Sequence, residues 1–134
     1  MSNPIKIGID ARTFSYTNSV SRGIGHYTLN HIKNIVEKEN DWNYILFTEE
    51  NIKNELTEIL QKYDNVEQKR YVDFTEGDIN LFHIPDPMNT SHGFDSPLRI
   101  IQNIPTTILF HDLIPLYFYY DSWPEQIRKL YDLG

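Results

Sequence analysis

Two short segments of the chain combine residue types that could bind a charged or hydroxylated ligand. The segment SRGIGHYT places Gly23 and Gly25 at the expected start of a helix, where backbone N–H groups can approach an anion and the helix dipole adds to the attraction. The segment FHDLIPL places His111 beside Asp112 at the expected end of a strand, where a histidine can exchange hydrogen bonds with a sugar hydroxyl or a phosphate. The chemistry that these segments favour is recognition of a phosphate- or sugar-bearing ligand.

The same residues also have structural interpretations. The two glycines could serve only to allow a tight turn from loop to helix, and Asp112 could cap a turn while His111 packs half-buried. A dinucleotide fingerprint opens directly after its strand, whereas a long polar loop precedes Gly23. The segment is therefore a weak match to an NAD site.

Two arginines flank that loop. Arg12 follows the first expected strand and could either meet a phosphate or form an internal ion pair, and Asp10 could hold the loop through hydrogen bonds to its backbone. Arg22 directly precedes the glycines and is the better phosphate candidate by position, with a solvated loop arginine as the alternative.

The remaining chemistry-bearing residues predict no metal site. The chain has five histidines and no cysteine, which removes thiolate zinc sites, disulfides and cysteine nucleophiles. His26, His31 and His92 show no spacing typical of metal ligands. His83 lies inside an apolar strand pattern, and we expect it to be structural.

Alternating apolar runs and amphipathic segments predict the elements that position these residues. Strands alternating with helices indicate an α/β fold with a parallel sheet covered on both faces. The expected strands are residues 5–9, 43–48, 66–72, 79–84 and 105–110, and the expected helices are residues 23–39, 52–63 and 123–134.

Ligands of open parallel sheets bind beyond the carboxyl ends of the strands. In this chain those ends are Asp10, Thr48, the Ile84-Pro85 junction and His111-Asp112, and long polar loops follow the first and third of them. Loops of that length in a compact domain are usually functional or mobile. We therefore expect the site at this edge.

Length, composition and net charge exclude several classes of protein. The 134 residues fit one domain, and a hydrophobic fraction of 40% is normal for a globular one. A net charge of −7 argues against a surface for nucleic acid. No run of about 18 apolar residues predicts a transmembrane segment. We expect a cytoplasmic domain, and the short final helix suggests a piece of a longer protein.

Four stretches, in matching order and spacing, resemble the N-terminal half of a retaining glycosyltransferase of family 4. The resemblance covers nearly the whole chain. The stretches are GIDAR at 8–12, RGIGHYT at 22–28, LFHIPD at 81–86 and FHDLIPL at 110–116.

The resemblance implies one half of a two-domain GT-B architecture. Residues 1–134 would be the acceptor-side, Rossmann-like domain, a doubly wound parallel sheet with helices on both faces. The donor-binding C-terminal domain, with its pair of glutamates, is absent. The implied partners are that domain, a nucleotide-sugar donor and a saccharide or lipid-linked acceptor of polysaccharide or lipopolysaccharide assembly. Association with the inner face of the membrane is compatible with this resemblance, and no cofactor or metal is implied.

The resemblance also implies roles for individual residues. The loop at Gly23 and Gly25 would face the donor's phosphates, and His26 would join it at a position where the family often has arginine. His111 would point at the transferred sugar. The resulting candidates are His111 and Asp112 for catalysis, and Arg12, Arg22, Gly23, Gly25 and His26 for binding substrate or phosphate.

Two other functional classes remain open from the sequence. The chain could be a non-catalytic α/β binding or interaction module whose partner contacts the aromatic residues between 117 and 123. A nucleotide-cofactor domain of an oxidoreductase is a weaker third hypothesis, because of the long loop before Gly23.

Overall fold

The computed structural model describes residues 3–15, 23–50, 52–85, 103–109 and 125. Its centre is a five-stranded sheet in which every neighbouring pair of strands is parallel. The order across the sheet is β3-β2-β1-β4-β5. The strands are β1 (Lys6–Asp10), β2 (Asn43–Thr48), β3 (Val66–Arg70), β4 (Leu81–Ile84) and β5 (Thr106–Ile108).

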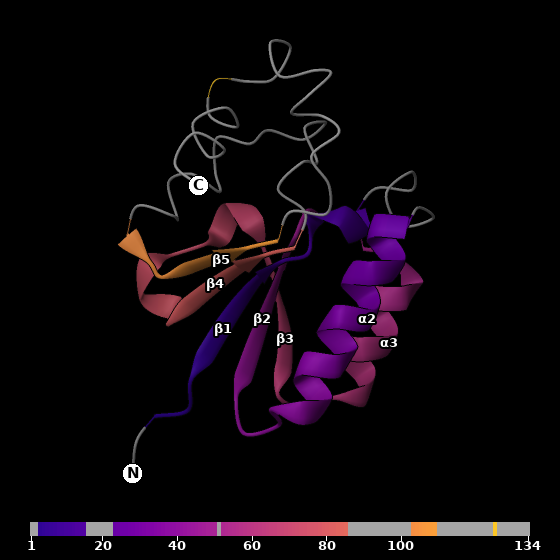
Figure 1. Cartoon of the computed structure of the whole chain (residues 1–134), viewed down its shortest axis with the longest axis horizontal. Coiled ribbons are helices and arrows are strands. Elements are labelled where there is room, and N and C mark those ends of the chain that lie inside the picture. The colour runs from indigo at the N-terminus through magenta and orange to yellow at the C-terminus, as the bar shows by residue number, and fades with distance from the viewer. Residues whose placement is uncertain (1–2, 16–22, 51, 86–102, 110–124, 126–134) are drawn as a thin grey trace.

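Two α-helices, α2 (Gly23–Lys38) and α3 (Asn54–Lys62), connect the first three strands. Both cover the same face of the sheet, as Figure 1 shows. Each helix joins two neighbouring parallel strands, and such a connection has to cross back over the sheet. The α/β, all-parallel architecture predicted from the alternating pattern is confirmed, and it is Rossmann-like.

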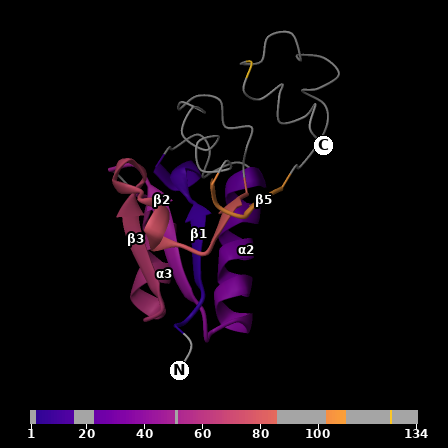
Figure 2. The same cartoon turned by 90° about the vertical axis from the view of Figure 1, so that its left-hand side faces the viewer.

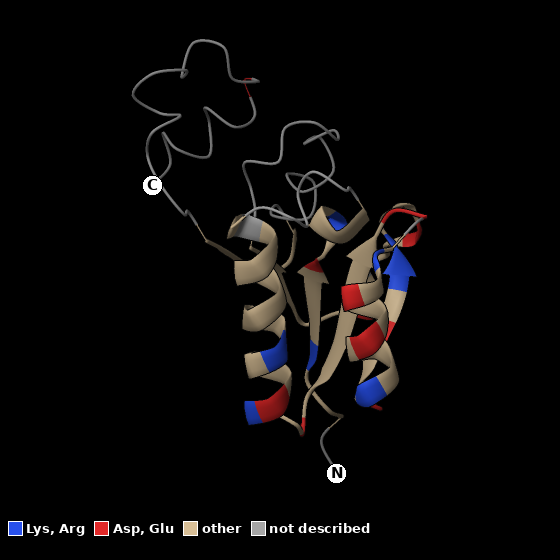
Figure 3. Ribbon diagram, turned by 90° about the vertical axis from the view of Figure 1, so that its right-hand side faces the viewer, with Lys and Arg blue, Asp and Glu red and all other residues tan. Residues whose placement is uncertain are grey.

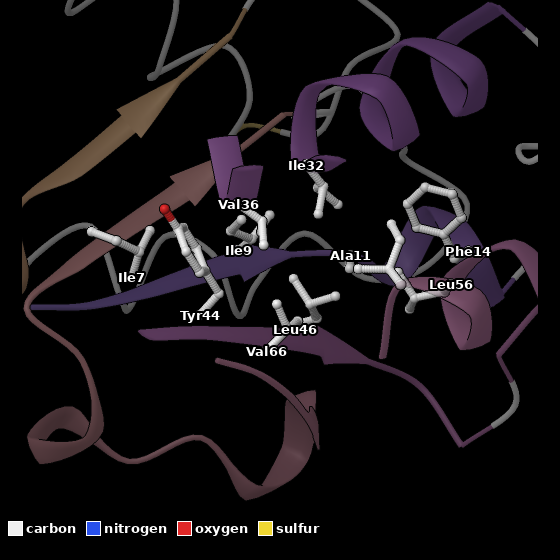
Figure 4. Close-up of a cluster of buried hydrophobic side chains, with 11 residues drawn as sticks. Ile7, Ile9, Ala11, Phe14, Ile32, Val36, Tyr44, Leu46, Leu56 and Val66 are labelled. Carbon is white, nitrogen blue, oxygen red and sulfur yellow. The ribbon is translucent and has the colours of Figure 1, made fainter. Parts of the chain in front are cut away.

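The apolar stripes of both helices pack on this first face. In Figure 4, Ile32 and Val36 of α2 lie over Ile9 of β1, next to Tyr44 and Leu46 of β2. All five side chains are at most 1% exposed. Burial of this size is the main favourable contribution to folding, so this cluster fixes α2 above β1.

The second face has a separate core. It gathers aromatic side chains around Phe47 of β2, with ring centroids 5.1 Å from Phe74 and 6.0 Å from Phe82. Gly8 of β1 lies beneath them, and a Cβ atom there would be only 2.6 Å from Ile79 Cδ1 and 2.9 Å from Phe47 Cε2. A side chain at this position of β1 would collide with the second core.

The expectation of helices on both faces needs correction within the described residues. The chain passes from β3 to β4 through two 3-10 turns, η2 (Tyr71–Asp73) and η3 (Glu76–Asp78), which pack on the second face. Too few residues separate the two strands to form a full α-helix and still span the sheet. The predicted strand 66–72 is two residues too long, because β3 ends at Arg70 and η2 begins at Tyr71. The predicted helix 123–134 lies outside the described residues.

Candidate functional site

The strand order reverses between β1 and β4. The chain leaves β1 in one direction, through α2 to β2, and reaches β4 on the other side of β1 only later. In open parallel sheets ligands bind at such a reversal, beyond the carboxyl ends of the strands. Figures 1 and 2 show that the start of α2 and the 3-10 turn η1 (Arg12–Ser15) lie at this end of the sheet.

Asp10 ends β1 and holds the turn that follows. One of its oxygens, Oδ1, accepts from the backbone N–H of Arg12 at 3.2 Å and from Arg12 Nε at 2.9 Å. The other, Oδ2, accepts from Arg12 Nη2 at 2.8 Å. Both residues are 8% exposed. Of the two alternatives for Arg12, the internal ion pair is thus the one present in the structure.

Arg12 is also held from the second face of the sheet. Its guanidinium carbon lies 4.0 Å from the centre of the Tyr71 ring, which is the geometry of a cation–π contact. Burial by itself would lower the pKa of Arg12, but the hydrogen bond and negative charge of Asp10 outweigh that effect and raise the pKa above its usual value. Arg12 therefore stays charged and clamps the end of β1 to η2.

The start of α2 is free of negative side chains. No acidic residue lies in its first turn, and Figure 3 shows Lys, Arg, Asp and Glu only toward the far end of this helix. The positive end of the helix dipole is therefore not neutralised by the helix itself. Gly23 is exposed, and a Cβ atom there would meet nothing within 4 Å. His26 is exposed and Gly25 is buried. Among the described residues, nothing occupies the space beside the Cα of Gly23.

Three predicted site residues, Arg22, His111 and Asp112, lie outside the described residues. Of the remaining four, Arg12 occupies η1, whereas Gly23, Gly25 and His26 share the first turn of α2. The structure therefore brings Gly23, Gly25 and His26 together on one helix end, and assigns Arg12 to a separate contact with Asp10.

A histidine pair that the sequence pattern did not reveal joins α2 to the sheet. The Nε2 atoms of His31, on α2, and His83, on β4, lie 3.0 Å apart. His83 Nδ1 lies 2.7 Å from Oγ1 of Thr107 on β5, and the ring of Tyr27 stacks on His31 at 5.6 Å. Burial and the neighbouring His31 lower the pKa of His83 to about 4. His83 is thus neutral at pH 7.

One buried hydroxyl on α2 is unusual. Thr28 is 0% exposed, and its Oγ1 has no hydrogen-bond partner among the residues that the structure describes. Thr28 lies between the glycines and His31 along the helix. A buried hydroxyl without a partner costs about 1–3 kcal/mol.

A shallow hollow lies at the carboxyl end of β3 and offers no comparable site. Its lining includes Lys69, Arg70 and Asp73. Lys69 pairs with Asp78 at 3.2 Å, and Arg70 pairs with Asp73 at 2.9 Å. Because both cations already have carboxylate partners, the hollow has little attraction for an added anion.

Comparison with protein-family models, with curated proteins and with solved structures gives no significant match. In the described part of the chain, no helix is long and apolar enough to cross a membrane.

Proposed function

We propose that the chain is the N-terminal, acceptor-side half of a retaining glycosyltransferase with GT-B architecture. In the whole protein this domain would face a second, donor-binding domain across a cleft. The reaction would move a hexose from a nucleotide-sugar to a saccharide or lipid-linked acceptor.

The observation that carries the proposal is the common location of the motif residues. The stretch GIDAR ends at the carboxyl end of β1, the described part of RGIGHYT begins α2, and the stretch LFHIPD includes all of β4. Because β1 and β4 are neighbours, all three reach the same edge at the reversal of strand order. A ligand site is expected there on physical grounds, and the resemblance implies that its ligand is a nucleotide-sugar.

The start of α2 supports a role toward a diphosphate. The first turn of α2 has no acidic residue, and a Cβ atom on Gly23 would meet nothing within 4 Å, so this helix end favours a negative group. As the glycosidic bond to the sugar breaks, negative charge grows on the leaving diphosphate, and fixed N–H dipoles stabilise that charge more than they stabilise the ground state. In the proposed reaction this helix end is one of the groups that hold the leaving group.

The proposed roles of the other candidates follow from their positions. His111 would contact the transferred sugar and stabilise its developing positive charge or hydroxyl groups, with Asp112 orienting the imidazole. Arg22 would reach the phosphates from the loop before Gly23. Arg12 would have a positioning role, because its ion pair with Asp10 holds the turn at the end of β1.

The test is a transfer assay on the complete gene product, with the reading frame followed past Gly134. We expect a second Rossmann-like domain, release of nucleoside diphosphate from a nucleotide-sugar, and retention of the anomeric configuration. Replacing His111 with alanine should lower kcat by about 10²-fold or more, in the range that a lost stabilising donor costs. The same variant should unfold at the wild-type denaturant concentration.

Two results would overturn the proposal. One is a complete gene product without a donor-binding domain and without transfer from any nucleotide-sugar, which would favour the binding-module hypothesis. The other is a His111→Ala variant with unchanged turnover, which would remove the catalytic role assigned to that residue.

A further inference from the structure

We propose that His31 and His83 form a binding site for a divalent transition-metal ion of the Zn²⁺ or Ni²⁺ type, with one Nε2 ligand from α2 and one from β4. This site is separate from the proposed glycosyl transfer and does not depend on it.

The spacing of the two Nε2 atoms fits a shared metal ion. Two imidazole nitrogens, each about 2.1 Å from one ion and about 90–109° apart around it, are about 3.0–3.4 Å from each other. The observed separation between His31 Nε2 and His83 Nε2 is 3.0 Å. The nitrogen separation therefore already suits a shared ion, and both rings would turn so that their Nε2 lone pairs point at it.

His83 has the outer hydrogen bond that metal-binding histidines usually make. Its Nδ1 lies 2.7 Å from Thr107 Oγ1. A proton on Nδ1 donated to this hydroxyl fixes the ring and leaves the Nε2 lone pair free for a metal. The strand register holds this contact, because His83 pairs directly with Thr107 across β4 and β5.

The proton balance of metal binding is simple. In the metal-free pair, one Nε2–H donates to the other Nε2. When the metal enters, the ring that donated this proton changes to its other neutral tautomer, with the proton on Nδ1. Both Nε2 lone pairs then face the ion. The rings remain neutral, and the complex gains the charge of the metal ion.

The protein supplies two ligands in this arrangement. In the described part of the chain, no group of three or more His, Cys, Asp or Glu side chains converges on one point. The His31–His83 contact is part-buried, and the Thr107 contact beside it is exposed. Water therefore completes the coordination from the open side, and imidazole ligands favour zinc, copper and nickel over magnesium or calcium.

The site would join two elements far apart in the sequence. His31 and His83 are 52 positions apart, so a bound ion would cross-link α2 to β4. Because such an ion binds the folded chain in preference to the unfolded one, it should raise the melting temperature as its concentration rises.

The experiment titrates the full 134-residue chain with ZnCl₂ and, separately, NiCl₂, and measures heat of binding, melting temperature and the ¹⁵N shifts of the histidine rings. We expect one ion per chain, a rise in melting temperature and a shift of both Nε2 signals. His31→Gln and His83→Gln should each weaken binding at least about tenfold, and Thr107→Val should weaken it about 10–100-fold. His26→Gln is the matched control, because His26 is an exposed histidine on the same helix.

Several outcomes would overturn the proposal: no saturable binding, binding that His31→Gln leaves unchanged, or equal loss in the His26→Gln control. If His83→Gln fails to fold, the ring signals of the wild-type chain decide the matter. A metal that shifts other histidines and leaves those of His31 and His83 in place contradicts the site.

Discussion

Arg12 and Asp10 are two residues apart and form a doubly hydrogen-bonded ion pair at 2.8 and 2.9 Å at the end of β1. The pair is almost fully buried and lies against Tyr71. Buried charges are costly unless they are paired. Loss of either side chain would therefore leave the other as an unpaired buried charge. The start of the turn η1, directly after β1, therefore depends on this contact.

Replacing Arg12 with methionine should destabilise the fold by about 3 kcal/mol, because it leaves the Asp10 carboxylate buried and uncompensated. Urea unfolding measures the change. The double variant Asp10→Asn with Arg12→Met should recover part of the loss, since the unpaired charge is gone. Additive losses in the double variant would contradict the coupling.

Gly8→Ala should destabilise the protein by about 1–3 kcal/mol, the usual cost of an extra methyl group in a packed core. The added Cβ would approach Ile79 Cδ1 at 2.6 Å and Phe47 Cε2 at 2.9 Å. Thermal unfolding of the variant tests this prediction. Gly77→Ala is the control, because a Cβ there meets nothing within 4 Å, and it should change stability far less.

Gly23→Ala should leave stability unchanged or raise it slightly, because alanine favours a helix and the position is open. In the proposed glycosyltransferase, the same methyl group would lie where a phosphate is proposed to approach the start of α2. We expect the KM for the nucleotide-sugar to rise about tenfold, an effect of about 1.4 kcal/mol. An unchanged KM would remove the start of α2 from the donor site.

Alkaline pH should lower the free energy of unfolding, because the Tyr44 hydroxyl ionises. Its hydroxyl donates to the backbone oxygens of Glu39 at 2.9 Å and Ile35 at 3.3 Å, and burial raises its pKa to about 12. Between pH 10 and 12 the unfolded chain loses this proton more readily than the folded one, so stability falls as the pH rises.

The loss attributable to Tyr44 should reach up to about 2 kcal/mol, after allowance for partial solvation of the hydroxyl. The measurement compares urea unfolding of the wild type and of Tyr44→Phe at pH 9 and pH 11.5. The variant should lose less stability over this interval. Equal losses in both proteins would show that other groups account for the alkaline effect.

Local patterns predicted most of the described elements. The six-residue strand Asn43–Thr48 has the bounds expected from its apolar run, and α2 begins at Gly23 as its amphipathic pattern indicates. These elements follow from side chains close together in sequence, which set helical or extended periodicity. The 3-10 turns between β3 and β4 escaped prediction, because their residues have no regular period and are held by contacts with Phe47 and Phe82.

The candidate site was predictable only in part. The carboxyl edge followed from the parallel order of strands, and the glycines marked the start of α2. The choice between a phosphate contact and an internal ion pair for Arg12 was not predictable, because both use the same guanidinium. The structure decides it through the hydrogen bonds of Arg12 to Asp10 and through Tyr71, which the chain after β3 brings over the end of β1.

The sequence by itself determined the order of strands and helices along the chain, the parallel sheet and the edge at which ligands should bind. These features follow from apolar periodicity and chain direction, which are properties of neighbouring residues. Tertiary structure alone decided that His31 meets His83 and that Thr107 holds the second ring. Those contacts join α2, β4 and β5 across 52 and 24 positions. They exist because the apolar stripe of α2 packs over β1 and thereby brings one polar side of that helix to β4.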